Sequence, residues 1–105
     1  MLRKVIIPYT VKEIKQNAFN GNNTIEEVEF QTKSGKGVTK IGDFAFANCT
    51  NLKSIVIPDT VTDIGSDAFY NCSNMTNIKL SKKIKQISYE MFHSCRACLL
   101  YTSDA

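Results

Sequence analysis

A repeat with a period of 23 residues constrains the fold of this chain more than any other feature. The segment IGDFAFANCTNLKSIVIPDTVT, starting at Ile41, aligns with IGSDAFYNCSNMTNIKLSKKIK, starting at Ile64. The matched pairs are Ile41/Ile64, Ala45/Ala68, Phe46/Phe69, Cys49/Cys72, Leu52/Met75, Ile55/Ile78, Ile57/Leu80 and Val61/Ile84. Self-similarity at a fixed period of a few tens of residues is the signature of repeat architectures. The chain is therefore predicted to stack coils.

The pattern continues on both sides of these two units. The upstream matches are Ile14, Ala18, Phe19, Ile25, Val28 and Phe30, and the downstream matches are Ile87, Met91, Phe92 and Cys95. One interruption lengthens the spacing from Phe30 to Val38 by four residues relative to Ile57 to Val61, and the polar segment QTKSGKG is predicted to loop out there. We predict four coils, over residues 2–24, 25–51, 52–74 and 75–95.

Each unit contains three short pieces. Ile55 and Ile57 alternate with residues of the opposite face, which is the period of a half-buried strand. A second extended piece covers residues 61–64. Residues 66–72 are predicted to form one helical turn, with Ser66 or Asp67 capping its free N–H groups.

Stacking of coils would align equivalent side chains in ladders, because no single unit can bury its apolar side alone. The predicted ladders are Val5–Val28–Ile55–Ile78, Ile14–Ile41–Ile64–Ile87 and Phe19–Phe46–Phe69–Phe92. Neighbouring coils would lie ~4.8 Å apart if their strands pair in parallel. The predicted fold class is an α/β solenoid of short parallel strands and single helical turns.

Three of the four cysteines, Cys49, Cys72 and Cys95, fall at the same position of successive units. Neighbouring members could form a disulfide if their Cα atoms lie ~4.4–6.8 Å apart. A ladder of reduced, buried thiols explains the regular spacing better, since cysteine is among the most buried residue types. Asn22 takes the corresponding place in the first coil.

The motifs I-x-I-P, V-T-x-I-G, A-F and N-C, at residues 55–58, 61–65, 68–69 and 71–72, resemble the BspA-type (Treponema-type) leucine-rich repeat. The resemblance covers residues 2 to 95. The outer units depart from it at Lys15, Asn22, Ser81, Ser88 and Met91. It implies a leucine-rich repeat fold, an extracellular or cell-surface location, and a role in adhesion or protein–protein contact. It implies no catalytic activity of the repeat itself.

Motifs for metal, cofactor or nucleotide chemistry are incomplete. Cys95 and Cys98, preceded by His93, lack the second ligand pair of a structural zinc site. Haem attachment requires a histidine where Leu99 stands. The segment 34–37, SGKG, lacks the spacing of a phosphate-binding loop. We predict no catalytic residues, no metal and no cofactor.

The charge balance argues against nucleic acid as the partner. The chain has 13 basic and 10 acidic residues, with a net charge of +3, whereas nucleic-acid-binding domains usually carry a strongly basic face. We interpret two groups of lysines as solvated surface: Lys33, Lys36 and Lys40, and Lys82, Lys83 and Lys85. No apolar run reaches the ~18–20 residues of a membrane span, and the N-terminus lacks the order of a signal peptide.

The two ends depart from the repeat. Residue 2 begins a strand at once, without an N-terminal capping unit. Residues 96–105, RACLLYTSDA, do not follow the repeat and resemble translated adapter or vector sequence. We therefore expect a repeat array over residues 1–95, a non-repeat tail of proposed foreign origin over 96–105, and a fragment of a longer protein.

The leading hypothesis is a binding module for a protein ligand such as a host matrix or surface protein. Its candidate face comprises the outward strand positions Lys4, Ile6, Glu27, Glu29, Ser54, Val56, Asn77 and Lys79. Solenoids present extended binding surfaces in this way. The alternative is a structural spacer without a dedicated ligand. An enzyme using His93, Cys95 and Cys98 ranks third.

Overall fold

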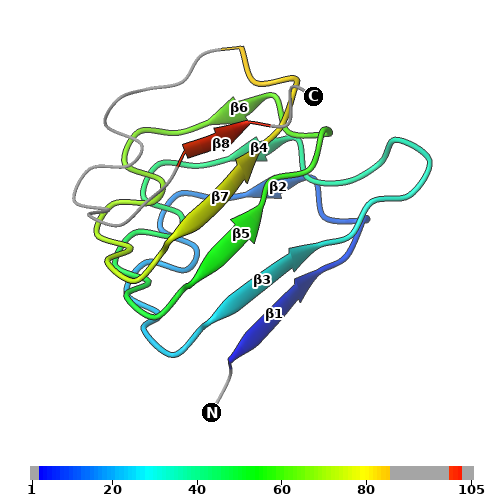
Figure 1. Cartoon of the computed structure of the whole chain (residues 1–105). Coiled ribbons are helices and arrows are strands. Elements are labelled where there is room, and N and C mark those ends of the chain that lie inside the picture. The colour runs from blue at the N-terminus through cyan, green and yellow to red at the C-terminus, as the bar shows by residue number, and fades with distance from the viewer. Residues whose placement is uncertain (1–2, 86–99, 103–105) are drawn as a thin grey trace.

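Short strands alternate along the chain between two parallel sheets (Figure 1). The computed structural model describes residues 3–85 and 100–102. The strands in these residues are β1 (Lys4–Ile7), β2 (Glu13–Ile14), β3 (Glu27–Phe30), β4 (Lys40–Ile41), β5 (Ser54–Val56), β6 (Asp63–Ile64), β7 (Asn77–Leu80) and β8 (Leu100–Thr102). The first sheet has the order β1-β3-β5-β7-β8 and the second has the order β2-β4-β6. Each of the first three coils thus contributes one strand to each sheet.

The register of both sheets confirms the predicted solenoid. Val5 pairs with Val28, Val28 with Ile55 and Ile55 with Ile78 in the first sheet. In the second sheet, Ile14 pairs with Ile41 and Ile41 with Ile64. The predicted fourth member of that ladder, Ile87, lies outside the described residues. Equivalent side chains stack directly because every coil repeats the same path, and the core lies between the two sheets.

The segments predicted as single helical turns are instead runs of tight turns, and no helix occurs in residues 3–85. In the second coil the N–H groups of Phe44, Phe46 and Asn48 donate to carbonyl oxygens of the third coil, at 2.7–3.1 Å. The N–H groups between them donate locally, three residues back. Phe44 and Asn48 have φ values of 57° and 59°, which an α-helix excludes. Bonding to the next coil therefore replaces the helical bond pattern.

The predicted capping role of Ser66 or Asp67 is absent for the same reason. The N–H of Ser66 donates to Oδ1 of Asp43 in the preceding coil, at 3.0 Å. An acidic side chain of one coil thus satisfies a backbone group of the next.

Phenylalanine rings and cysteine thiols fill the interior behind these turns. The rings of Phe19, Phe46 and Phe69 are stacked, with centroids 5.2 and 5.6 Å apart. Cys49 and Cys72 are buried, and their Sγ atoms lie 3.2 Å from the carbonyl oxygens of Phe19 and Phe46 respectively. The other predicted ladder members, Phe92 and Cys95, lie outside the described residues.

Burial makes both described thiols weak acids. It raises the pKa of Cys49 to about 11 and that of Cys72 to about 12, against 9.0 for a free thiol. A thiol of this kind is chemically inert near neutral pH, because the thiolate is the reactive form. Cys49 and Cys72 therefore serve to fill the core.

The four-residue insertion in the second coil forms a miniature hairpin that projects between β3 and β4 (Figure 1). Lys33 and Lys36 exchange two backbone hydrogen bonds of 3.0 and 2.9 Å around Ser34 and Gly35. These two central residues have φ values of 52° and 77°, as a two-residue hairpin turn of type I′ requires. Lys33 Nζ lies 5.4 Å from the centroid of the Tyr9 ring, which is a contact between the hairpin and the first coil.

Strand β8 lies within the segment 96–105 that the sequence analysis sets apart. It pairs in parallel with β7, with Leu100 opposite Ile78 and Thr102 opposite Leu80. Part of that segment thus continues the first sheet. The proposed foreign origin of the segment and the coil boundaries stay predictions.

Candidate interaction surface

The outer face of the first sheet carries the eight predicted surface residues, and all eight are exposed. Two rows cross the sheet along its paired strands. The first contains Lys4, Glu27, Ser54 and Asn77, and the second contains Ile6, Glu29, Val56 and Lys79. Side chains differ within each row, whereas the neighbouring inward row is aliphatic throughout. We call these eight residues the strand face.

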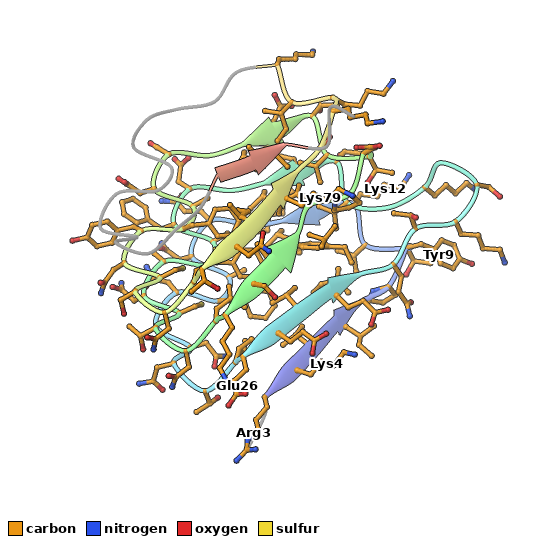
Figure 2. The ribbon with its side chains drawn as sticks, viewed as in Figure 1. Arg3, Lys4, Tyr9, Lys12, Glu26 and Lys79 are labelled. Carbon is orange, nitrogen blue, oxygen red and sulfur yellow. The ribbon has the colours of Figure 1, made fainter. Side chains whose placement is uncertain are left out.

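Ion pairs organise one end of the strand face. Lys4 Nζ lies 3.3 Å from Glu29 Oε1 and 3.8 Å from Glu27 Oε2 (Lys4 is labelled in Figure 2). The side-chain hydrogen bond to Glu29 and the charges of both carboxylates raise the pKa of Lys4. Beside the face, Lys53 Nζ lies 3.5 Å from Glu26 Oε1. These pairs are solvated and contribute little to stability, so a partner can rearrange them at small cost.

Two apolar side chains of the strand face are exposed to solvent. Ile6 is 50% exposed and Val56 is 58% exposed, and they are the large exposed hydrophobic residues of the described chain. Scattered single apolar residues are common on protein surfaces. Here both occupy the row that also holds Glu29 and Lys79, so the strand face offers apolar and charged groups together.

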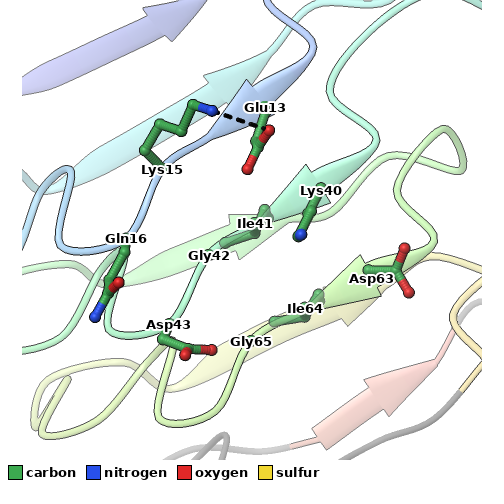
Figure 3. A pocket seen from close by; sticks show the side chains of 10 residues that line it. All are labelled: Glu13, Lys15, Gln16, Lys40, Ile41, Gly42, Asp43, Asp63, Ile64 and Gly65. Carbon is green, nitrogen blue, oxygen red and sulfur yellow. Dashed lines mark hydrogen bonds and ion pairs between the residues drawn. The ribbon is translucent and has the colours of Figure 1, made fainter.

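A groove of about 380 Å³ crosses the second sheet (Figure 3). Its lining consists of Glu13, Lys15, Gln16, Lys40, Ile41, Gly42, Asp43, Asp63, Ile64 and Gly65. A Cβ atom on Gly42 would lie 2.7 Å from the backbone N of Gln16, and one on Gly65 would lie 2.7 Å from the carbonyl carbon of Gly42. The glycine of the V-T-x-I-G motif is therefore required by the close approach of adjacent coils.

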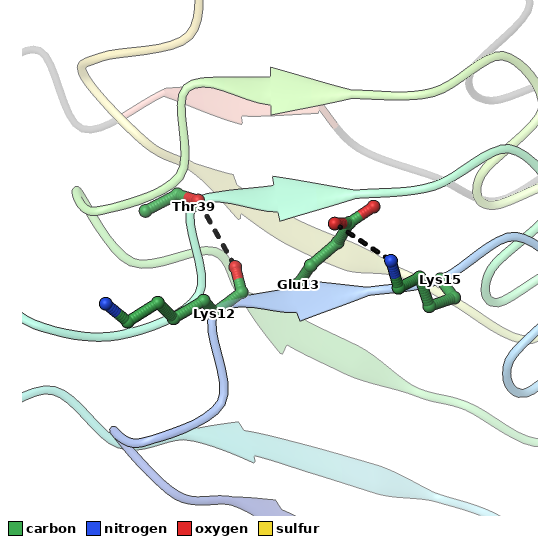
Figure 4. Close-up of polar contacts among 4 residues, drawn as sticks. All are labelled: Lys12, Glu13, Lys15 and Thr39. Carbon is green, nitrogen blue, oxygen red and sulfur yellow. Dashed lines mark hydrogen bonds and ion pairs between the residues drawn. The ribbon is translucent and has the colours of Figure 1, made fainter.

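Charges within this groove compensate one another. The outward residues Glu13, Lys40 and Asp63 alternate in sign along the sheet register. Lys15 Nζ lies 3.3 Å from Glu13 Oε1, and Thr39 Oγ1 donates to the carbonyl of Lys12 at 3.2 Å (Figure 4).

Metal or thiol chemistry has no visible site in the described part of the chain. Within residues 3–85 and 100–102, no three His, Cys, Asp or Glu side chains are grouped so as to hold a metal ion. The residues of the third-ranked hypothesis, His93, Cys95 and Cys98, lie outside the described ranges.

Asparagine side chains form a polar ladder that the sequence analysis did not predict. Asn71 Nδ2 donates to Asn48 Oδ1, and Asn48 Nδ2 donates to Asn20 Oδ1, both at 3.0 Å. The N-C motif could have indicated the contact between Asn48 and Asn71, since these residues are one period of 23 residues apart. Asn20 lies 28 residues before Asn48, so the first link cannot be found from the period alone.

No helix in the described residues has the length and apolar character needed to cross a bilayer.

Comparison with known proteins agrees with the geometry. The family model described as BspA type leucine rich repeat region (6 copies) matches residues 1–102. No curated protein matches the chain by sequence. The crystal structure of a leucine rich cell surface protein from Faecalibacterium prausnitzii A2-165 superposes with a TM-score of 0.86 at 29% sequence identity. The match covers 98% of this chain and 26% of that one, so the chain spans about a quarter of its length. The chain belongs to the BspA-type leucine-rich repeat family.

Proposed function

We propose that this chain is a non-catalytic adhesion or protein-interaction module of a cell-surface protein, and that the strand face contacts the partner. One observation carries the proposal. The inward ladders of the first sheet are apolar throughout, while the eight outward positions of the same strands are exposed and vary from coil to coil. A constant frame with a variable outer surface suits recognition of another macromolecule. The surface location rests on the similar Faecalibacterium protein.

The strand face suits a protein partner with basic and apolar groups. Glu27 and Glu29 accept hydrogen bonds from cations, and Ile6 and Val56 offer apolar area on either side of Glu29. Charged groups set the association rate and specificity, whereas buried apolar groups supply much of the affinity. Recognition would therefore proceed by complementarity of shape and charge.

The size of the face sets an upper limit on affinity. Four strands spaced ~4.8 Å apart, with four residues each rising ~3.3 Å, give a footprint of roughly 250 Å². A stable interface typically covers about 800 Å² per partner. We therefore expect this face alone to bind in the micromolar range or more weakly, with affinity rising steeply when several copies are linked.

The test is charge reversal on the strand face. The wild-type chain and the variant Glu27→Lys/Glu29→Lys are immobilised and exposed to a panel of purified extracellular matrix proteins. The matched control is Glu13→Lys/Asp63→Lys, which makes the same charge change on the second sheet.

Loss of a captured protein with the first variant, and retention with the control, is the expected result. Identical capture by all three proteins would refute the strand face as the binding surface. Absence of capture, even by an array displayed at high density, would favour a structural spacer instead.

A further inference from the structure

The connections that follow β1, β3, β5 and β7 lie along one edge of the solenoid, and coil-to-coil hydrogen bonds hold them there. Gln31 N donates to the carbonyl of Ile7 at 2.9 Å, and Thr60 Oγ1 donates to the carbonyl of Val38 at 2.7 Å. Ser81 Oγ donates to the carbonyl of Val61 at 2.8 Å. The connections of all four coils are therefore neighbours in space.

Lysines dominate this edge. Six of them, all exposed, come from three coils: Lys12, Lys33, Lys36, Lys82, Lys83 and Lys85. We call this set the basic edge. The only carboxylate on the described connections is Asp59, and its Oδ1 accepts the backbone N–H of Lys82 at 2.9 Å. The second-sheet strands begin beside this edge with Glu13, Lys40 and Asp63. Together these three side chains add a net charge of only −1.

The two lysine groups that are separate in the sequence lie along this same edge, on connections two coils apart. With coils ~4.8 Å apart, the four connections span only ~15 Å. The hairpin bearing Lys33 and Lys36 projects outward there, on the side where Figure 2 labels Tyr9 and Lys12. None of the six lysines forms an ion pair within the described residues, whereas Lys4, Lys15 and Lys53 elsewhere are paired. A column of unpaired like charges attracts a polyanion.

The composition of the edge favours one class of polyanion. Proteins that bind single-stranded nucleic acid use exposed aromatic rings for stacking. The described connections contain one aromatic ring, that of the partly buried Tyr9 with Lys33 Nζ 5.4 Å from its centroid, and no arginine. Insertion into a membrane surface requires exposed apolar side chains, yet Val11 and Ile84 pack against the core. The exposed threonines Thr10 and Thr32 accompany the lysines instead. The hydroxyls of Thr39, Thr60 and Thr62 already donate to backbone carbonyls and can only accept further hydrogen bonds.

We propose that the basic edge binds a linear acidic polysaccharide through its sulfate or carboxylate groups. The lysine ammonium groups would neutralise the anionic groups, and the threonine hydroxyls would bond to the sugar. This site is separate from the strand face and does not depend on the proposed function of that face.

Two variants with the same charge change test the proposal. The edge variant is Lys33→Gln/Lys36→Gln/Lys82→Gln/Lys83→Gln. The off-edge variant is Lys4→Gln/Lys15→Gln/Lys53→Gln/Lys79→Gln. Fluorescence anisotropy measures binding to labelled heparin, hyaluronan and a single-stranded DNA oligonucleotide at about 0.1 M salt, where exposed charges are screened beyond ~10 Å. Urea unfolding of both variants verifies that they are folded.

We expect the edge variant to bind heparin about 10-fold or more weakly, taking each lost contact at the value of an exposed ion pair. The off-edge variant should stay within about 3-fold of wild type on the same reasoning. Binding of heparin without hyaluronan would assign the site to sulfate groups, and binding of both would include carboxylates. Equal losses in the two variants, no heparin binding by the wild type, or tighter edge-dependent binding of DNA would each overturn the proposal.

Discussion

Replacement of Phe46 by alanine tests the idea that the stacked rings hold neighbouring coils together. The Phe46 side chain is fully buried. Its ring lies between Phe19 and Phe69 at 5.2 and 5.6 Å, and it meets Phe30 edge-on at 6.3 Å. A buried Phe→Ala change costs about 3–5 kcal/mol. Three aromatic neighbours, each contributing about 0.5–1.5 kcal/mol, place Phe46 at the upper end of that range.

Phe19 provides the matched comparison. It is only partly buried and stacks on one ring, that of Phe46. We expect Phe19→Ala to lower the free energy of unfolding by about half as much, roughly 2 kcal/mol, because both the buried area and the ring contacts are smaller. The difference between the two variants isolates the effect of a central position in the ladder.

Urea unfolding followed by far-UV circular dichroism is the assay, since the chain contains no tryptophan to report by fluorescence. The midpoint gives stability if the slope is unchanged. A small domain has a free energy of unfolding of only about 5–15 kcal/mol. The loss expected for Phe46→Ala is therefore close to the whole stability of a domain at the lower end of that range. Phe46→Leu, with an expected loss of about 1–3 kcal/mol, keeps the comparison measurable. Equal losses at positions 46 and 19, for either substitution, would refute the stacking argument.

Three further predictions concern the glycine, cysteine and asparagine positions. Gly65→Ala should lower the free energy of unfolding by about 1–3 kcal/mol in the same urea assay, because its Cβ would overlap the backbone of the preceding coil. The free energy of unfolding should fall as pH rises above 9, because the raised pKa values of Cys49 and Cys72 mean that the unfolded state loses its thiol protons first. The slope should be up to ~1.4 kcal/mol per pH unit and per thiol. A Cys49→Ala/Cys72→Ala variant should have a flatter pH profile of stability, and an unchanged profile would exclude the thiols as its cause. Asn48→Ala should cost about 1–2 kcal/mol, as it removes two side-chain hydrogen bonds, and a loss below about 0.3 kcal/mol, well short of one such bond, would show that solvent replaces the ladder.

The ladders were predictable because each depends on a regular period in the sequence. Val28, Ile55 and Ile78 recur at equivalent positions, and parallel stacking follows because each coil repeats the same order of short pieces. The outward positions of the strands follow from the same alternation. The partners of Lys4 did not follow from it, since its contact with Glu29 is diagonal across two strands and depends on the register.

The turns could not be predicted because their hydrogen bonds are not local. Residues 43–49 resemble a helical turn in spacing, but the N–H of Phe46 donates to the carbonyl of Ala68, 22 residues away. The left-handed conformation of Phe44 has no signal in the sequence, since a bulky residue seldom adopts it. The basic edge was missed because Lys33 and Lys82 are seen to share one edge only when the insertion and the stacking are both known.

The insertion in the second coil shows where this architecture accepts new sequence. On one side of it, Gln31 N donates to Ile7 O at 2.9 Å, and on the other, Thr39 N donates to Lys12 O at 2.8 Å. Register is thus restored within one connection, and the core on either side is undisturbed. Extra residues at an exposed connection cost little closure entropy. The connection edge is therefore the part of each coil that can diversify, by natural variation or by grafting of foreign loops, while the stacked interior remains unchanged.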